Sequence, residues 1–126
     1  MIKNLIITCL LGMLSIILGA FGAHALKDLL TTAQLLSFET AVRYQMYHVI
    51  VLLFVNTYHG FSPTQKNRIS FLFFFGILFF SGSIYAIQLT KITAKLIWFI
   101  TPFGGVLLAI GWGYMLAYFI TNELKK

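Results

Sequence analysis

Two stretches of this sequence, residues 5–23 and 69–90, contain no charged side chain and are long enough to cross a lipid bilayer as helices. A hydrocarbon core of about 30 Å takes about 20 residues at a rise of about 1.5 Å each. Inside it the backbone has no water to bind, so its amide and carbonyl groups must pair within the segment, as they do in a helix. These stretches therefore indicate a helical membrane protein.

The composition of the chain supports the same fold class. Of the 126 residues, 60% are hydrophobic and 10% are charged, whereas soluble domains average about 25% charged residues. Two further stretches, 40–58 and 96–120, complete a set of four predicted transmembrane helices with 5–23 and 69–90. We therefore expect an all-α fold, an integral membrane four-helix bundle formed by a single domain that covers residues 1–126.

The connections between these helices carry signals for turns and helix starts. Residues 24–37 combine several leucines with charged residues, which predicts a short amphipathic helix at the membrane interface. Within them, Thr31 and Gln34 have the spacing of a capping box at a helix start. Residues 62–64 predict a turn before the third helix, and Pro102 suits a kink or a first-turn position in the fourth.

Small residues recur every three or four positions from Thr8 onward and would lie on one face of the first helix. Such a face lets two helices approach closely in lipid. We therefore interpret residues 5–23 as a retained helix, although residues 23–25 resemble a signal-peptide cleavage site. The residues predicted to serve helix packing, here and in the later helices, are Gly12, Ser15, Gly19, Gly22, Gly82, Gly104, Gly105 and Gly111.

The net charge of +6 comes from nine basic and three acidic residues. In a soluble protein this excess would suggest nucleic acid as a partner. Here the basic residues stand singly or in pairs at the ends of apolar stretches, where membrane topology and lipid headgroups explain them. Four helices place both termini on one side, and the basic residues of the two sides are Lys3, Lys66, Arg68, Lys125 and Lys126 against Lys27, Lys91 and Lys95. The positive-inside rule then predicts that both termini are cytoplasmic.

Polar and small residues gather toward the outer ends of the predicted helices, while the inner halves are mostly Leu, Ile, Val and Phe. Residues 38–48, which open the second helix, contribute most of them. Polar groups are costly in hydrocarbon, so this clustering favours a pocket or a polar contact between helices. The candidate polar pocket consists of His24, Glu39, Arg43, Tyr44, Gln45, His48, Ser81, Ser83, Tyr85 and Thr101.

Helical spacing divides the start of the second helix into two faces, at about 100° per residue. Glu39 and Arg43 are four residues apart, which predicts an intrahelical ion pair near the headgroups. Gln45 and His48 lie on a deeper edge that faces other helices, where we expect His48 to be neutral and hydrogen-bonded. The candidate partners of His48 are Tyr44, Ser81, Ser83 and Thr101. Trp112 on the fourth helix is expected to face lipid or the interface.

Four ordered segments of the chain carry a family resemblance. They are GAFGAHAL at 19–26, YQMYH at 44–48, FSGSIY at 80–85 and TPFGG at 101–105, followed by Gly111 and Trp112. In this order they resemble a family of small bacterial inner-membrane proteins of unknown function, which has a small eukaryotic transmembrane protein as a distant relative. The resemblance covers residues 12–112. It implies four helices in the bacterial inner (plasma) membrane, a multi-pass topology and no established activity.

Three functions are compatible with these residues. We favour a non-enzymatic membrane module whose outer-leaflet polar pocket binds a lipid, a lipophilic small molecule or a partner helix, which includes a second copy of the chain. The first alternative is an outer-leaflet enzyme in which His48 acts as acid or base and Arg43 holds an anionic headgroup. The second is a haem or metal redox protein with His24 and His48 as ligands. No third ligand follows from the spacing, and the single Cys9 supports no metal motif or disulfide. We therefore expect no metal or cofactor, membrane lipids as partners, and no nucleic acid.

Overall fold

Five helices make up the computed structural model, which describes residues 2–125. They are α1 (Ile2–His24), α2 (Thr32–Thr57), α3 (Pro63–Leu89), α4 (Ala94–Ile97) and α5 (Ile100–Glu123). No strand occurs among the described residues, and the all-α fold class is confirmed. Lys126, which enters the count of basic residues above, lies outside the described range.

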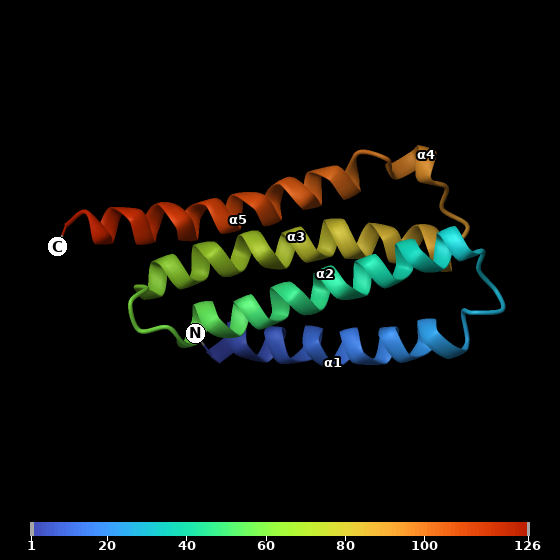
Figure 1. Ribbon diagram of the computed structural model, residues 1–126, viewed down its shortest axis with the longest axis horizontal. Coiled ribbons are helices and arrows are strands. Elements are labelled where there is room, and N and C mark those ends of the chain that lie inside the picture. The colour runs from blue at the N-terminus through green and yellow to red at the C-terminus, as the bar shows by residue number, and fades with distance from the viewer. Residues whose placement is uncertain (1, 126) are drawn as a thin grey trace.

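The four long helices run antiparallel and pack in the order α1, α2, α3 and α5, each against the next (Figure 1). α2 and α3 are therefore the inner helices, and α1 and α5 form the two edges. Both chain termini and the α2–α3 connection lie at one end of the molecule, which we call the termini end (Figure 1). The α1–α2 connection and α4 lie at the other, which we call the α4 end (Figure 1).

A capping box starts α2 well before its apolar stretch. The Thr31 side chain accepts a hydrogen bond from the Gln34 backbone N–H, and the Gln34 side chain accepts one from the Thr31 N–H, so the predicted capping box is confirmed. From this start α2 runs without interruption for 26 residues. The predicted separate interfacial helix over residues 24–37 is wrong, because residues 25–31 form turns and the residues after them belong to α2 itself.

Proline residues set the starts of α3 and α5. Ser62 forms a second capping box, and Pro63 follows at the first helical position, where its missing N–H leaves no bond unmade. The predicted turn over residues 62–64 is therefore the start of α3. The predicted helix over 96–120 is divided into α4 and α5, and Pro102 lies in the first turn of α5 as expected. Its ring clashes with the carbonyl four residues earlier, which explains why the helix does not continue back through α4.

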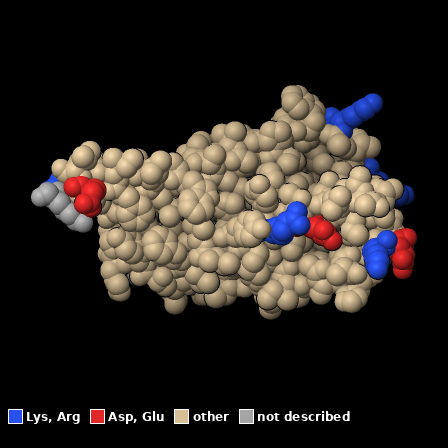
Figure 2. Space-filling model, viewed as in Figure 1, with Lys and Arg blue, Asp and Glu red and all other residues tan. Residues whose placement is uncertain are grey.

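Apolar side chains from α2, α3, α5 and the α2–α3 connection form the core. Its members are Leu52, Val55, Phe61, Ile69, Phe73, Ile77, Leu108 and Met115. The outer faces are apolar as well: Ile16 on α1 is 66% exposed and Leu116 on α5 is 61% exposed. Figure 2 shows a broad uncharged belt on the face it presents, with charged side chains toward the two ends. Such a surface is unfavourable in water and suits contact with lipid.

Three helices, α1, α3 and α5, are long and apolar enough to cross a membrane. α2 has the length but carries Arg43, Gln45 and His48, which lower its hydropathy. The fold is thus helical, with three membrane-capable helices, while a fourth span and the orientation of the termini stay predictions.

Candidate functional site

Small residues of α1 bring it close to α2. The contact face consists of Thr8, Gly12, Ser15, Gly19 and Gly22. A Cβ added at Gly22 would lie only 2.8 Å from the ring of Phe38 on α2. Ser15 Oγ donates to the backbone carbonyl of Val42 at 3.1 Å. One face of α2 therefore lies directly against the α1 backbone.

Glycines of α5 differ in how closely they approach α3. Gly104 lies against the α3 backbone, where any Cβ would clash, and a Cβ at Gly111 would lie 2.7 Å from a phenylalanine ring of α3. Gly105 has only an ordinary contact, at 3.6 Å, and the nearest atom to Gly82, at 3.8 Å, belongs to its own helix. Only two of the four glycines predicted for these helices therefore lie where a larger residue does not fit.

Gln45 is a buried residue that joins three helices and is only 3% exposed. Its Nε2 donates to the carbonyl of Leu11 on α1 at 2.7 Å, and its Oε1 accepts from the Tyr85 hydroxyl on α3 at 2.8 Å. The Tyr85 ring packs against Phe38 at a centroid distance of 5.3 Å. Because both ends of the amide have partners, the cost of burying it is offset.

His48 is enclosed between α2, α3 and α5, with 5% of its surface exposed. Its Nε2 lies 3.2 Å from the indole Nε1 of Trp112, which can only donate, so Nε2 is the acceptor. Nδ1 then carries the proton and donates to the backbone carbonyl of Tyr44 at 2.6 Å. The ring also packs against Phe73, with centroids 5.3 Å apart. His48 is thus a neutral imidazole with both nitrogens occupied.

Trp112 contacts His48 and was not among the site residues predicted from the sequence. The expectation that it faces lipid is half right, because 48% of its surface is exposed while its N–H points inward to His48. Tyr44 was among the candidate partners of His48, but the atom used is its backbone carbonyl and not its hydroxyl. The rotation of α5 that aims the indole inward leaves no local trace in the sequence.

The enclosure of His48 bears on both alternative functions. An acid or base at this position would have to break one of its two hydrogen bonds before reaching a substrate proton. His24 lies exposed at the end of α1, where its neighbour Gly22 packs on Phe38. Phe38 is ten residues from His48, about 15 Å along α2. The two imidazoles are therefore not brought together as a ligand pair, and no metal-binding group of three or more His, Cys, Asp or Glu occurs in the described part of the chain.

Hydroxyl groups join α3 to both of its neighbours. Ser81 Oγ donates to the backbone carbonyl of Ala41 on α2 at 2.7 Å. Ser83 and Thr101 share a hydrogen bond of 2.5 Å between α3 and α5. Ser81 and Ser83 are both buried. Ser81 and Ser83, predicted as part of a pocket, are instead occupied in contacts between helices.

The exposed side of α2 carries the remaining predicted residues. No ion pair forms between Glu39 and Arg43, which corrects the sequence prediction: Arg43 donates instead to the hydroxyl of Thr40, three residues earlier, at 3.2 Å. Glu39 and Arg43 line a shallow cleft of about 250 Å³ together with Gly19. Tyr44 is 41% exposed and stacks on a phenylalanine of α3 at 4.8 Å.

The cavity at the α4 end lies beside the predicted cluster. It has a volume of about 340 Å³, and its lining residues are Ser37, Thr40, Ile84, Ile87, Gln88, Ala94 and Thr101. Thr101 is the one member of the predicted pocket on this wall. The Gln88 Oε1 atom is buried and accepts no hydrogen bond from the described residues. Leaving such an acceptor unsatisfied costs about 1–3 kcal/mol.

A second polar cluster, at the termini end, was not predicted, because the inner halves of the helices were expected to be plainly apolar. Asn56 is 2% exposed; it donates to a serine of α3 at 2.9 Å and accepts from Asn4 of α1 at 3.1 Å. The buried Lys66 amine donates to the Asn56 carbonyl at 3.1 Å. The sequence did carry a signal for this cluster, since Asn56 lies on the same face of its helix as Gln45 and His48.

The fold and these contacts define a small all-helical membrane protein whose buried polar groups mostly serve to join helices. A family model described as "Protein of unknown function (DUF423)" matches residues 18–105. The chain therefore belongs to the DUF423 family, and the resemblance drawn from its four segments to a bacterial membrane family of unknown function is confirmed.

Bacterial membrane proteins of the same kind are similar along most of the chain. A UPF0382 membrane protein of Staphylococcus saprophyticus is 44% identical over 108 residues, which cover 86% of this chain and 88% of that protein. A UPF0382 membrane protein of Haemophilus influenzae is 38% identical over 114 residues, 87% of each chain. No solved structure matches this chain.

Proposed function

We propose that this protein is a multi-pass four-helix bundle of the bacterial inner membrane with both termini in the cytoplasm. In support, α2 is flanked by α1 and α3, and its uncharged polar residues Gln45, His48 and Asn56 are buried against other helices, so it can cross lipid despite its composition. The termini end also carries more basic residues than the α4 end, as expected for a cytoplasmic side. They are Lys3, Lys66, Arg68 and Lys125.

Single cysteines test this orientation. In a Cys9→Ser background, Thr64→Cys places a thiol at the termini end and Thr93→Cys places one at the α4 end. A membrane-impermeant maleimide added to intact cells should label position 93 and reach position 64 only after permeabilisation. The reverse pattern, or labelling of both positions in intact cells, would overturn the topology.

The function that the geometry supports best is the binding of a neutral lipid or lipophilic molecule in the cavity at the α4 end. The observation that carries this proposal is the buried Gln88 Oε1, which has no donor among the described residues and belongs to a side chain that lines a cavity of about 340 Å³. Ligand sites of small molecules typically measure about 300–1,000 Å³. None of the lining residues is charged, and two isoleucines supply apolar wall. A neutral ligand with a hydroxyl or amide donor fits this lining.

Monoolein, a neutral lipid with two hydroxyl donors, is a suitable probe, and its dimethyl ether is a matched lipid without donors. Native mass spectrometry in mild detergent should show monoolein retained about five- to tenfold better than the ether, as expected for one hydrogen bond. Gln88→Leu should abolish this difference. Equal retention of the two lipids by the wild-type protein would refute the proposal. The same spectra report whether a second copy of the chain or another membrane protein stays bound.

A pair of matched variants separates occlusion of the cavity from general damage. Ala94→Phe puts a ring into the cavity and should lower monoolein retention. Ala117→Phe makes the same change in a cavity at the opposite end and should leave monoolein retention as it is. If both variants had the same effect, binding would not be at the α4 end.

A further inference from the structure

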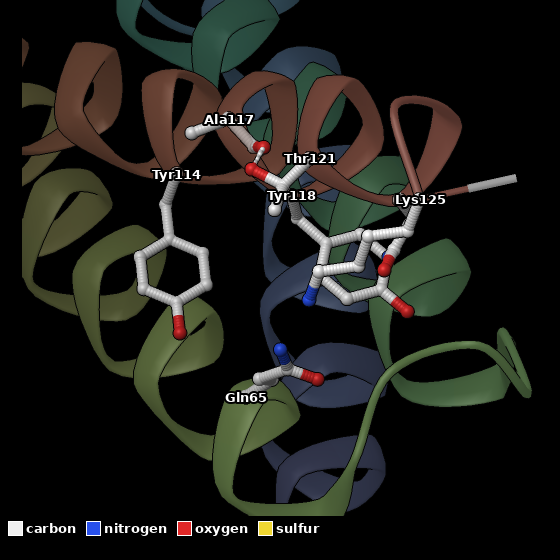
Figure 3. Close-up of a pocket in the computed structure, with 7 residues that line it drawn as sticks. Gln65, Tyr114, Ala117, Tyr118, Thr121 and Lys125 are labelled. Carbon is white, nitrogen blue, oxygen red and sulfur yellow. Dashed lines mark hydrogen bonds between the residues drawn. The ribbon is translucent and has the colours of Figure 1, made fainter.

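A second cavity lies at the termini end, between the first turn of α3 and the last turns of α5, and measures about 280 Å³. Figure 3 shows Gln65 of α3 facing Tyr114 and Tyr118 of α5, and Lys125 just after α5, across this opening. The Gln65 Oε1 atom is held by the backbone N–H of Ser62, which fixes the amide and leaves its nitrogen toward the cavity (Figure 3). The wall therefore offers donors from an amide, a phenol and an ammonium group.

An apolar cleft of about 450 Å³ adjoins this polar cavity, and Tyr114 lines both. Its other side is formed by Arg68, Phe71 and Leu72, which share one face of α3 at helical spacing. Phe71 is 60% exposed, so the cleft is open to the surrounding lipid. A polar cavity and an apolar cleft that meet at a tyrosine match the two parts of a phospholipid.

The charges of this site have one sign. Arg68 and Lys125 lie on its walls, and among the described residues no acidic side chain lines either the cavity or the cleft. We propose that this site binds one anionic phospholipid, with its phosphate held by Arg68, Lys125 and the Gln65 amide and one acyl chain along Phe71 and Leu72. Basic side chains at a membrane surface attract anionic headgroups, and charged partners make the stronger hydrogen bonds.

Dioleoyl-phosphatidylglycerol and dioleoyl-phosphatidylcholine, which differ in headgroup charge, are the probes. In native mass spectrometry of the purified full-length protein, the anionic lipid should be retained about tenfold better or more. Arg68→Gln and Lys125→Gln should each weaken its binding about fivefold. Lys95→Gln, a matched charge removal at the α4 end, should leave it unchanged.

The variants Ala94→Phe and Ala117→Phe also test this site, where Ala117→Phe is the blocking variant and Ala94→Phe is the control. Ala117→Phe fills the polar cavity and should lower phosphatidylglycerol binding while monoolein is still retained, which also shows that the variant is folded. Ala94→Phe should do the opposite. This proposal and the one for the α4 end can therefore fail independently.

Two outcomes would overturn the assignment of an anionic phospholipid. One is equal retention of both phospholipids, and the other is a loss of phosphatidylglycerol binding in Lys95→Gln as large as in Arg68→Gln and Lys125→Gln. Either would show that no selective charged site exists at this end. Glycerophosphoglycerol, the headgroup without acyl chains, should bind far more weakly than the intact lipid. If it bound as tightly, the site would be one for a free anion.

Discussion

The close contact between α5 and α3 at Gly104 leads to a sharp prediction about stability. Gly104 and Gly105 are neighbours on α5, yet they face α3 differently. A Cβ added at Gly104 would lie 2.7 Å from the carbonyl carbon of Phe79 and would overlap the backbone nitrogen of Phe80. A Cβ added at Gly105 would meet only the Phe80 ring, at an ordinary 3.6 Å. Alanine at the two positions should therefore have opposite effects.

The magnitudes follow from two terms. Alanine is favoured over glycine inside a helix by about 0.8–1 kcal/mol, and this gain applies to both variants. Overpacking costs about 1–3 kcal/mol, and the upper part of that range applies at Gly104 because backbone atoms cannot rotate away. Gly105→Ala should then be more stable than the wild type by up to about 1 kcal/mol, and Gly104→Ala less stable by about 1–2 kcal/mol.

Reversible unfolding in mixed sodium dodecyl sulfate and dodecyl maltoside micelles, followed by circular dichroism, measures this difference of about 2–3 kcal/mol. Gly113→Ala provides a control, because a Cβ at Gly113 meets nothing within 4 Å. It should behave like Gly105→Ala. If Gly104→Ala were as stable as the other two variants, α3 and α5 would not approach one another as closely as described.

Three further substitutions test the buried polar contacts. Gln45→Leu leaves the Tyr85 hydroxyl of α3 without its partner and removes the side-chain hydrogen bond to a carbonyl of α1, so it should cost about 1–3 kcal/mol in the same unfolding assay; a negligible loss would contradict the bridge. Trp112→Phe should shift the ¹⁵N resonance of His48 Nε2 in selectively labelled protein while the Nδ1–H tautomer persists, and an unshifted resonance would refute the contact. Asn56→Ala should cost about 1–3 kcal/mol, whereas the exposed neighbour Thr57→Ala should be nearly neutral; equal losses would show that the buried cluster adds nothing.

Local patterns carried most of what could be predicted about the fold. The helical class follows from the uncharged stretches, because the bilayer leaves the backbone few alternatives. The capping box at Thr31 follows from the chemistry of four consecutive residues, and it appears as predicted. Where the prediction failed nearby, as with the separate interfacial helix over residues 24–37, the reason was that a helix start was recognised but not joined to the helix that follows it.

The candidate site was less predictable because it depends on how helices rotate about their own axes. The Trp112–His48 contact joins residues 64 positions apart and requires one particular rotation of α5. The expected Glu39–Arg43 pair has the right spacing, but side-chain rotamers decided in favour of a threonine hydroxyl. The environment of Gln88 arises only where the break between α4 and α5 opens a cavity.

The polarity of α2 is best understood as the means by which the fold is specified in lipid. Apolar helices gain little from burial in a bilayer, so close packing and hydrogen bonds must fix their rotation and depth. Gln45, His48 and Asn56 follow one another at spacings of three and eight residues on one face and have partners on α1, α3 and α5. A rotation of α2 by one residue, about 100°, would remove the hydrogen bonds that all three make to other helices. Because α2 is held in this way at two depths, Ser37 and Thr40, which α2 contributes to the cavity at the α4 end, are held in fixed positions in its wall.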